Sequence, residues 1–424
     1  MKRKIRISQL NDYVFIAILC STAVYSLVSK LLTKIGFSGL TMLVCAVLIY
    51  FPLFLSLCYS AQTRREIMPF LVMYVFAVLF FAFTLALHPN YKPYYFRSDY
   101  LDIRYAIFRP DIGAIWGMLA FCICRDVDRL KKNLKIVLII LVLYNLYRFV
   151  NAHGVWEGYN ISGMRIEKSY SLNYGYDVAF CLILCVLFYR EKRKKLYILV
   201  SIVLFWIILT NGSRGALIPP AFFLLLCYLD HVKSMQSGKK FLIIFLLLLV
   251  VVAIYYYLDN ILLALIRLAQ RLNISSRTLR FLMSGNIIND NGRVEIYKIS
   301  WAAIKEQSFW GNGAYGSRWI IAPWFFWGYP HNIFLEFIME YGWMIGLILL
   351  ISIAALIVAA FRDPREEMRI LMFVFAAINL KLLISDSYWT APLFWYMIGF
   401  LISRQETAGG FRIKIRKKVP TGLQ

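Results

Sequence analysis

Long apolar segments recur along most of this sequence, and their length limits the possible folds more than any other feature. Each is close to the roughly 17–25 residues that a helix needs to cross the hydrocarbon core of a bilayer. Hydrophobic residues make up 61% of the 424 residues and charged residues 17%, which is far more apolar surface than a soluble globular protein needs. The sequence therefore predicts an all-α, polytopic membrane protein with a single transmembrane domain over residues 1–424.

About twelve transmembrane helices are expected from the hydropathy of the chain. The links between them alternate in character: one set is short and rich in Lys and Arg, and the other is longer and richer in Tyr, Asn, Gly and Trp. The expected spans are residues 12–32, 39–59, 69–87, 107–124, 134–150, 173–189, 196–211, 214–229, 241–258, 332–360, 368–386 and 390–403.

The basic links predict the orientation of the chain in the membrane; Arg190–Lys195 and Arg362–Arg369 are two examples. Because positively charged links stay on the cytoplasmic side, both termini are expected in the cytoplasm and the segments 89–109, 151–173 and 259–331 on the outer face. The same asymmetry accounts for the net charge of +24. Aromatic and basic residues do not interleave outside the spans as they do in nucleic-acid-binding surfaces, so no nucleic-acid partner is expected.

The outer segment 259–331 is the longest break between apolar spans, and about 70 residues are too many for an unstructured connection in a compact protein. Residues 262–273 have the apolar spacing of an amphipathic helix that lies in the membrane interface. Residues 293–305 show a second helical pattern. The apolar side of this second helix is expected to comprise Ile296, Trp301 and Ile304. The sequence thus predicts a large, partly helical outer loop within the membrane domain.

Two arginines of the outer side are candidates for binding an anion. Ser213-Arg214-Gly215 lies at the turn between the seventh and eighth spans. Ser213 can cap the following helix, whose amino terminus favours an anion, and the planar guanidinium of Arg214 can bind a phosphate through two hydrogen bonds. The alternative is an arginine that extends to the lipid headgroups. Arg293, at the start of the second loop helix, is either another phosphate ligand or a solvated residue of the helix start.

A histidine marks the join between the outer loop and the tenth span, in Pro330-His331-Asn332. Asn332 is a good helix cap, which places His331 at the outer end of the span, where an imidazole can take a proton from a sugar hydroxyl near neutral pH. Glu336 and Glu340 follow on one helix face, and carboxylates at membrane depth usually face a cavity or a partner. The alternatives are a structural histidine that contacts tyrosine or lipid, and glutamates paired with an arginine.

Further charged residues flank the fourth and eleventh spans. Arg104 and Arg109 are positioned to help bind a diphosphate on the outer side. Two nearby aspartates, three residues apart, are too unspecific a pattern to indicate a metal site, and we expect no metal and no cofactor. Lys381 and Asp386, near the outer end of the eleventh span, are expected to pair with each other.

Taken together, these motifs resemble the O-antigen ligase and polymerase superfamily, bacterial membrane enzymes that assemble surface polysaccharides. The pattern of that superfamily is Ser-Arg-Gly at the outer start of a span, a large outer loop, an Arg followed by a Trp, a Gly-rich turn, and His-Asn leading into a span with Glu and Gly. The resemblance covers roughly residues 200–350. The matching residues are Ser213-Arg214-Gly215, Arg293 to Trp301, Gly311 to Gly316, His331-Asn332 and Glu340-Tyr341-Gly342.

The resemblance implies a fold similar to the large helical GT-C-like transferases and metal-independent glycan transfer from an undecaprenyl diphosphate donor. Arg214 and Arg293 would bind the donor diphosphate, and His331 would orient or deprotonate the acceptor hydroxyl. The supporting residues would be Arg104, Arg109, Ser213, Asn332, Glu336 and Glu340. Placed cations suit this reaction because negative charge develops on the leaving diphosphate. The partners would be the lipid-linked glycan donor and acceptor, the lipid bilayer and a protein that regulates chain length.

Three functions remain open from the sequence. The first is a polymerase of O-antigen or capsular repeat units in the bacterial cytoplasmic membrane, with its active site on the outer face; it is favoured because the outer segments contain no evident docking domain for a second acceptor. The second is a ligase that transfers a finished glycan to lipid A core or to a protein. The third is a lipid-glycan flippase, which would have charges along a central cavity and short outer loops, whereas here the polar residues concentrate at one outer face.

Overall fold

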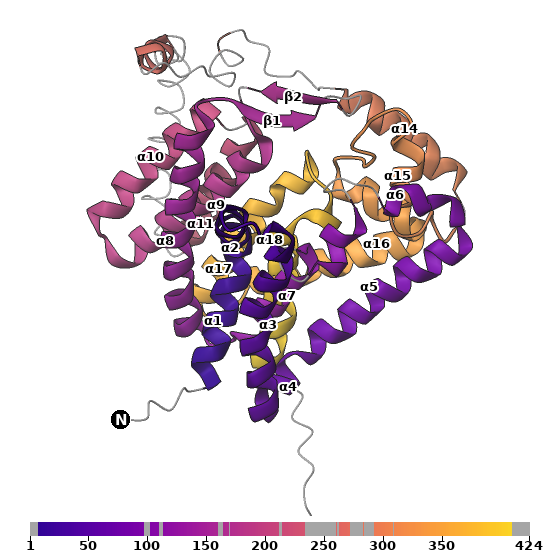
Figure 1. The fold of residues 1–424 in the computed structure, drawn as a ribbon, viewed down its shortest axis with the longest axis horizontal. Coiled ribbons are helices and arrows are strands. Elements are labelled where there is room, and N and C mark those ends of the chain that lie inside the picture. The colour runs from indigo at the N-terminus through magenta and orange to yellow at the C-terminus, as the bar shows by residue number, and fades with distance from the viewer. Residues whose placement is uncertain are drawn as a thin grey trace, which may run out of the picture.

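The structure of the protein is a computed structural model, and 82% of its described residues are helical (Figure 1). The described residues are 7–96, 102–109, 113–159, 164–168, 170–211, 214–233, 260, 263–271, 283, 292–307 and 309–408. Two short strands, β1 (Trp156–Tyr159) and β2 (Arg165–Lys168), pair in antiparallel register and lie at the top of the view. The expectation of an all-α membrane fold is confirmed.

The helices follow the chain with short 3-10 or π turns between several of them. The α-helices are α1 (Ile7–Leu19), α2 (Ser21–Lys34), α3 (Thr41–Tyr59), α4 (Ala61–Glu66), α5 (Met68–Leu87), α6 (Lys92–Tyr95), α7 (Gly117–Ile123), α8 (Val127–Ala152), α9 (Leu172–Lys192), α10 (Lys195–Asn211), α11 (Ile218–Lys233), α14 (Arg293–Glu306), α15 (Gly316–Ile321), α16 (Ile333–Phe361), α17 (Glu366–Asn379) and α18 (Pro392–Ala408). The shorter turns are η1 (Ser38–Leu40), η2 (Pro89–Tyr91), the π-helix η3 (Arg104–Phe108), η4 (Ala114–Trp116), η5 (Arg214–Leu217), η6 (Leu380–Leu383) and η7 (Tyr388–Thr390).

Fewer full-length spans occur among the described residues than the twelve expected. Those long and apolar enough to cross a membrane are Ser38–Tyr59, Met68–Leu87, Val127–Ala152, Leu172–Lys192, Gly215–Val232 and Ile333–Phe361. The pair α1 and α2 passes the same test together but is bent by 78°, so it adds a seventh span only if it crosses as one. Shorter apolar helices at Ala114–Ile123, Lys195–Thr210 and Pro392–Ser403 fall within three other expected spans. The expected span 241–258 lies outside the described residues.

α7 shows why apolar composition overcounts the spans. Every residue of this short helix is buried, so it is apolar because it lies in the protein core. α7 packs closely against α18: a Cβ on Gly117 would lie 2.3 Å from Cε1 of Tyr396, and a Cβ on Gly399 would lie 2.5 Å from the carbonyl oxygen of Met118. Such close approach of helix backbones through small residues is common inside membrane proteins.

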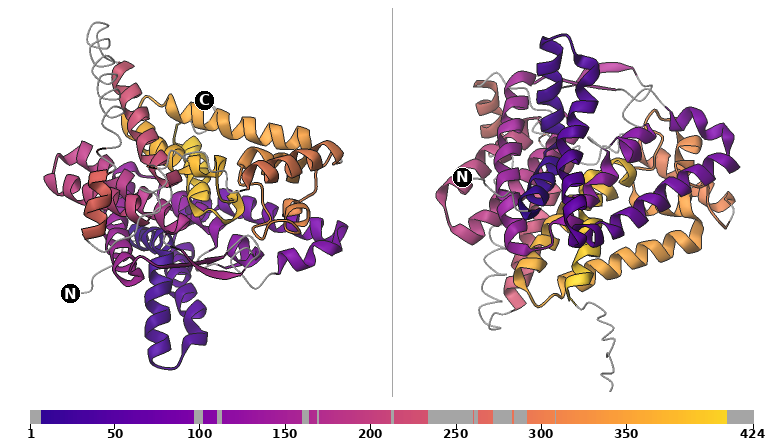
Figure 2. Two further views of the ribbon diagram at one scale, coloured as in Figure 1. Left: turned by 90° about the horizontal axis from the view of Figure 1, so that it is seen from above. Right: turned by 60° about the horizontal axis from the view of Figure 1, so that its bottom comes forward.

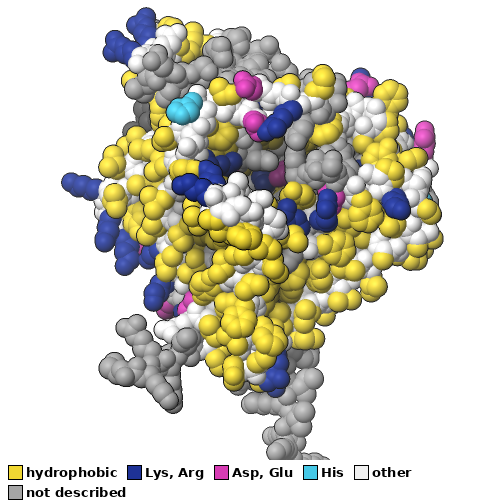
Figure 3. All heavy atoms as spheres, in the orientation of Figure 1, with side chains coloured by type: hydrophobic (Ala, Val, Ile, Leu, Met, Phe, Trp, Pro, Cys, Tyr) yellow, Lys and Arg dark blue, Asp and Glu magenta, His cyan; other side chains and the backbone are white. Residues whose placement is uncertain are grey.

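The outer helices expose the apolar surface that a membrane protein needs. α2 and α3 form a hairpin that projects from the body of the molecule (Figure 2). Hydrophobic side chains cover much of the face in Figure 3, most densely in its lower part. Exposed phenylalanines of α3 and α5 include Phe51, Phe54, Phe76 and Phe83. Because this surface is too extensive for a soluble monomer, we assign it to contact with lipid.

The long helix α16 is broken at Gly342, where φ is 77° and ψ is 173°. A break at this point leaves the preceding carbonyls without their helical partners. The loop before α15 supplies replacements: Nε2 of Gln307 donates to Ile338 O at 2.9 Å, the amide of Asn312 to Met339 O at 2.8 Å, and the amide of Gly313 to Glu340 O at 2.9 Å. Only glycines fit here, because a Cβ on Gly342 would lie 2.0 Å from Phe309 O and one on Gly311 would lie 2.3 Å from the Gly342 nitrogen.

Both helices expected in the outer loop form where they are described. Residues 263–271 are helical, and Ala269 packs against Leu209 of α10. α14 covers the second expected helix, and Ile296 and Ile304 of its expected apolar side are buried. Trp301, which was expected on the same side, has a side chain that is 45% exposed.

The helical period explains why Trp301 differs from Ile296 and Ile304 in burial. Positions four residues apart share a helix face, so Ser300, midway between Ile296 and Ile304, occupies the buried position. Its hydroxyl donates to the carbonyl of Ile296 at 2.7 Å, which satisfies it inside the helix. Trp301 instead lies on the outside of α14, against Trp343 of α16, with 5.7 Å between the ring centroids.

Candidate functional site

Five elements that are distant in sequence converge around the start of α16. His331 precedes α16 by two residues, Arg293 begins α14, Asp386 lies between η6 and η7, and Tyr176 belongs to the first turns of α9. The charges of Arg293 and Asp386 both act on His331 and on the hydroxyl of Tyr176. A Cβ on Gly215 of η5 would lie 2.6 Å from that hydroxyl. The turn that carries Arg214 is therefore part of the same group of elements.

His331 is fixed by its local backbone. It has a φ of 55°, in the left-handed region, and the Asn332 side chain caps α16 by accepting from the amides of Phe334 and Leu335 at 3.0 and 3.2 Å. Nδ2 of Asn332 donates to the Leu383 carbonyl at 3.2 Å, which attaches the start of α16 to η6. The expected cap at Asn332 is thus confirmed.

The imidazole of His331 is partly buried and contacts the ring of Tyr329, with 4.4 Å between centroids. Nδ1 is shielded from solvent and has no hydrogen-bond partner among the described residues. Burial and the positive charge of Arg293 lower the pKa of His331 to about 3, against the opposing effect of Asp386. The ring is therefore neutral at pH 7, with Nδ1 left without a described hydrogen-bond partner.

Asp386 brings a carboxylate to this group, and the sequence reasoning gave it no role beyond its pairing with Lys381. That pairing is confirmed by a distance of 2.9 Å between Nζ of Lys381 and Oδ2 of Asp386. Oδ1 accepts from the amide of Ser387 at 2.9 Å and from the hydroxyl of Thr390 at 3.3 Å. Asp386 also has a positive φ of 66°, so its position is set by local bonds in a conformation unusual for a residue other than glycine.

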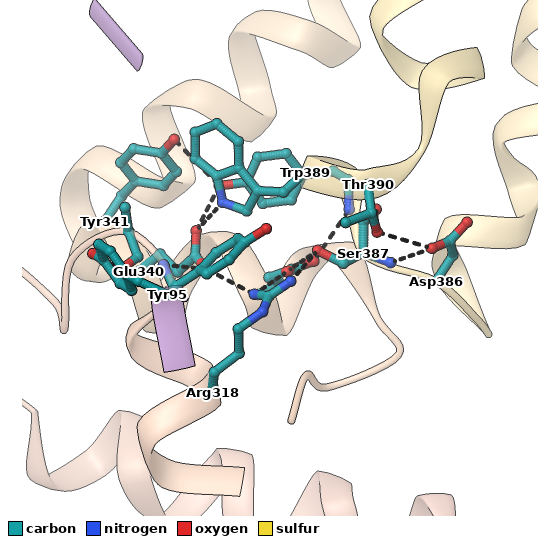
Figure 4. A network of polar contacts seen from close by, with 12 residues as sticks. Tyr95, Arg318, Glu340, Tyr341, Asp386, Ser387, Trp389 and Thr390 are labelled. Carbon is teal, nitrogen blue, oxygen red and sulfur yellow. Dashed lines mark hydrogen bonds and ion pairs between the residues drawn. The ribbon is translucent and has the colours of Figure 1, made fainter. Parts of the chain in front are cut away.

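Glu336 and Glu340 lie in a second, fully buried cluster, and their partner is an arginine (Figure 4). Nη1 of Arg318, from α15, lies 3.7 Å from Glu336 and 3.9 Å from Glu340. Glu336 also accepts from the hydroxyl of Ser387 at 2.5 Å, and Glu340 accepts from Nε1 of Trp389 at 2.7 Å. These bonds join α15, α16 and η7 in one buried network.

Arg318 was missed in the sequence, where it stands between aromatic and apolar residues of the loop and has no charged neighbour. Its side chain is completely buried, and the guanidinium carbon lies 3.4 Å from the ring centroid of Tyr315. No local pattern signals such a residue, because its carboxylate partners come from another helix. Arg318 and Glu336 of this cluster both hydrogen-bond to the hydroxyl of Ser387. Because Ser387 is next to Asp386 in the chain, the cluster attaches this segment to α16.

The remaining candidates are only partly brought into these two groups. Arg104 forms an ion pair with the buried Asp102 at 2.9 Å, and its own side chain is 56% exposed. Arg109 lies over the rings of Tyr25 and Tyr105, at 5.1 and 4.9 Å from the centroids. η3, which contains Arg104, packs against η7.

Ser213, Arg214 and Arg293 are described to different extents. Ser213 and the side chain of Arg214 lie outside the described residues, although the backbone of Arg214 begins η5. Arg293 is partly buried at the start of α14, after Gly292 with a φ of 82°. Among the described residues, no group of three or more His, Cys, Asp or Glu side chains has a metal-binding arrangement.

A family model described as O-antigen ligase matches residues 199–351. The matched segment runs from α10 into α16 and contains Gly215, Arg293 and His331, so the resemblance to the O-antigen ligase and polymerase superfamily is confirmed. It implies a multi-pass membrane enzyme of the general kind that transfers glycans. The comparison with curated proteins found no match, and neither did the comparison with solved structures.

Proposed function

We propose that this protein is a glycosyltransferase of the bacterial cytoplasmic membrane that polymerises undecaprenyl-diphosphate-linked repeat units into O-antigen or capsular polysaccharide. The reaction takes place on the outer face and uses cationic side chains rather than a metal. Arg214 and Arg293 bind the donor diphosphate, and His331 receives the proton of the acceptor hydroxyl. The family match over residues 199–351 supports the general class of enzyme.

The observation that carries this proposal is the environment of His331. Its Nδ1 is buried without a hydrogen-bond partner among the described residues, beside the charges of Arg293 and Asp386. Buried polar atoms of a purely structural histidine are nearly always hydrogen-bonded. A neutral imidazole with an available ring nitrogen next to a cation suits a site where a hydroxyl loses its proton and a diphosphate leaves.

The proposed step is a direct displacement at the anomeric carbon of the donor sugar. The acceptor hydroxyl oxygen forms a bond to this carbon as the bond from the carbon to the diphosphate oxygen breaks. The diphosphate leaves with the electron pair, and the hydroxyl proton passes to His331. Arg214 and Arg293 stabilise the charge that develops on the leaving group, since fixed cations act strongly where water is excluded.

The low pKa of His331 fits this role once the donor is present. Without substrate, burial and Arg293 hold the pKa at about 3, which would make the imidazole a weak base. A bound diphosphate brings negative charge next to Arg293, and nearby negative charge favours the protonated form of histidine. Donor binding therefore raises the basicity of His331 at the time when a proton must be accepted.

A ligase is the second candidate, and the description of the matching family favours it. In that reaction the same residues would transfer one finished glycan to lipid A core or to a protein. The two reactions share the donor and differ in the acceptor. Product analysis separates them: long chains on the lipid carrier indicate a polymerase, and a single transfer to core indicates a ligase.

The test uses purified protein in liposomes with lipid-linked repeat units, in the presence of a chelator. Arg293→Ala and His331→Asn are each expected to reduce glycan transfer by at least about 100-fold, the lower end of what a group that stabilises the leaving charge or a general base contributes. Arg165→Ala and His153→Asn are matched controls, since both side chains are exposed on the surface. Arg214→Lys should also lose most activity, because lysine keeps the charge but cannot form the bidentate hydrogen bonds of a planar guanidinium. Normal polymer from His331→Asn would contradict the assigned base.

A further inference from the structure

The hydroxyl of Tyr176 is a buried polar group without a hydrogen-bond partner among the described residues. The side chain is 2% exposed, and its hydroxyl has neither solvent contact nor a hydrogen-bond partner among the described residues. Leaving such a group unpaired destabilises the folded protein, and roughly 90% or more of buried polar groups have a hydrogen-bond partner. A phenylalanine would fill the same space without this destabilisation, so the hydroxyl requires another explanation.

The neighbours of the hydroxyl indicate the charge of the missing partner. A Cβ on Gly215 would lie 2.6 Å from the hydroxyl oxygen, so the hydroxyl points at the backbone of η5, directly after Ser213 and Arg214. η5 leads into α11, and the first amides of a helix favour an anion. Nζ of Lys381 lies 5.6 Å from the centroid of the Tyr176 ring, and the charge of Arg293 acts on the hydroxyl.

Asp386, the described carboxylate whose charge acts on the Tyr176 hydroxyl, does not reverse this balance. Asp386 is paired with Lys381 at 2.9 Å and accepts hydrogen bonds from its own loop. The hydroxyl therefore faces a helix start and the positive charge of Arg293, without a described acceptor of its own. Among the described residues, this phenol is a hydrogen-bond donor without an anionic acceptor.

We propose that the hydroxyl of Tyr176 donates a hydrogen bond to a diphosphate oxygen of the lipid-linked donor, at the start of η5. Tyr176 is then a substrate-binding residue that acts together with Arg214 and Arg293. Gly215 is required at its position because any side chain there would displace the hydroxyl. This inference rests on the proposed function, since it names a further contact to the same diphosphate.

The experiment measures binding of farnesyl diphosphate, a short isoprenyl diphosphate, to the purified full-length protein in detergent, together with thermal stability without ligand. Tyr176→Phe is expected to weaken binding about 10- to 100-fold, the effect of one hydrogen bond to a charged group. Its melting temperature without ligand should stay the same or rise, because an unpaired buried hydroxyl is removed.

Tyr174→Phe is the matched control. Tyr174 is equally buried two residues away, but its hydroxyl donates to the carbonyl of Asn145 at 2.9 Å. Removing it should lower the melting temperature and leave the affinity for farnesyl diphosphate unchanged. The two neighbouring tyrosines are thus expected to give opposite results in both measurements.

Gly215→Ala provides an independent variant, because the added Cβ would displace the Tyr176 hydroxyl without removing it. It should weaken binding and lower stability, and Tyr176→Phe in the same chain should restore the stability but not the affinity. If the wild type binds the probe and Tyr176→Phe binds equally well, the inference is wrong and the proposed function stands. If the wild type does not bind, or if Arg293→Ala binds as tightly, the proposed diphosphate site is wrong and the inference falls with it.

Discussion

Two features of His331 each lower the stability of the folded protein, and a purely structural residue would avoid both. Its left-handed backbone, with a φ of 55°, costs a residue other than glycine about 1–3 kcal/mol. Its buried Nδ1 also lacks a hydrogen bond among the described residues. Strained residues persist only where the surrounding structure holds them, and here the Asn332 cap and the contact with Tyr329 do so.

The lowered pKa of His331 predicts how stability depends on pH. The pKa is about 3 in the folded protein and about 6.5 in an unfolded chain, so the unfolded state binds more protons between these values. The folded protein therefore loses stability as the pH falls below 6.5, by up to about 1.4 kcal/mol per pH unit. His331→Asn should reduce the drop in melting temperature between pH 7 and pH 4.5.

The control for this pH series is His153→Asn. His153 is exposed and also has a positive φ, of 45°, a conformation that asparagine tolerates. The backbone effect of the substitution is therefore similar at both positions. An equal pH dependence in wild type and His331→Asn would show that the imidazole is not kept neutral by the fold.

The residues found from the sequence differ in kind from those that were missed. His331 and Arg293 could be identified because each stands at a helix start and belongs to a local motif. Tyr176 and Arg318 could not, because their significance depends on partners from other elements: Gly215 in one case, and Glu336 and Glu340 in the other. Apolar periodicity places a residue on an element but does not indicate which elements meet.

At the scale of elements, α16 shows the same limit. Its expected range, 332–360, agrees closely with the observed Ile333–Phe361, since a long apolar run is a strong signal. The break at Gly342 was not predicted, because a single glycine is tolerated in a helix. It becomes visible only when the loop around Gly311 is seen to pack against it.

The break predicts a large effect of Gly342→Ala. The new Cβ would lie 2.0 Å from the carbonyl oxygen of Phe309, and φ is 77°. Alanine is therefore disfavoured both by this steric clash and by the positive φ. We expect the free energy of unfolding to fall by at least about 2 kcal/mol and the melting temperature to fall by several degrees. Gly39→Ala is the control, because nothing lies within 4 Å of its Cβ position. Equal melting temperatures for the two variants would mean that the loop does not pack on α16 in this way.

For the whole molecule, the break divides α16 into two parts with different surroundings. Before it, Glu336, Phe337, Met339, Glu340 and Tyr341 are buried. After it, Trp343, Met344, Leu347, Ile348, Ile351 and Val358 are exposed. The second part, Trp343–Phe361, extends about 28 Å as a helix, close to the hydrocarbon thickness of about 30 Å. We expect the outer membrane boundary near Trp343, with the loop and the first part of α16 above it.

This boundary can be tested with arginine substitutions on one helix. Ile351→Arg would place a charge near the middle of the second part, at a cost of about 2.5–3.5 kcal/mol for membrane insertion, and should reduce the folded protein in membranes about 10-fold or more. Phe334→Arg is the control, because Phe334 is similarly exposed but lies in the first part. It should accumulate at nearly the wild-type amount. A similar loss in both variants would place the boundary at the start of α16 instead.

The hydrogen bonds from Gln307, Asn312 and Gly313 to α16 also attach the loop before α15 to this helix. Detaching this loop would break three hydrogen bonds to carbonyls just before the break, each worth about 0.5–1.5 kcal/mol. The loop and the helix should therefore move together, with amide protons that exchange at similar rates. Under the proposed function, the segments that move to admit a glycan would then lie elsewhere in the molecule.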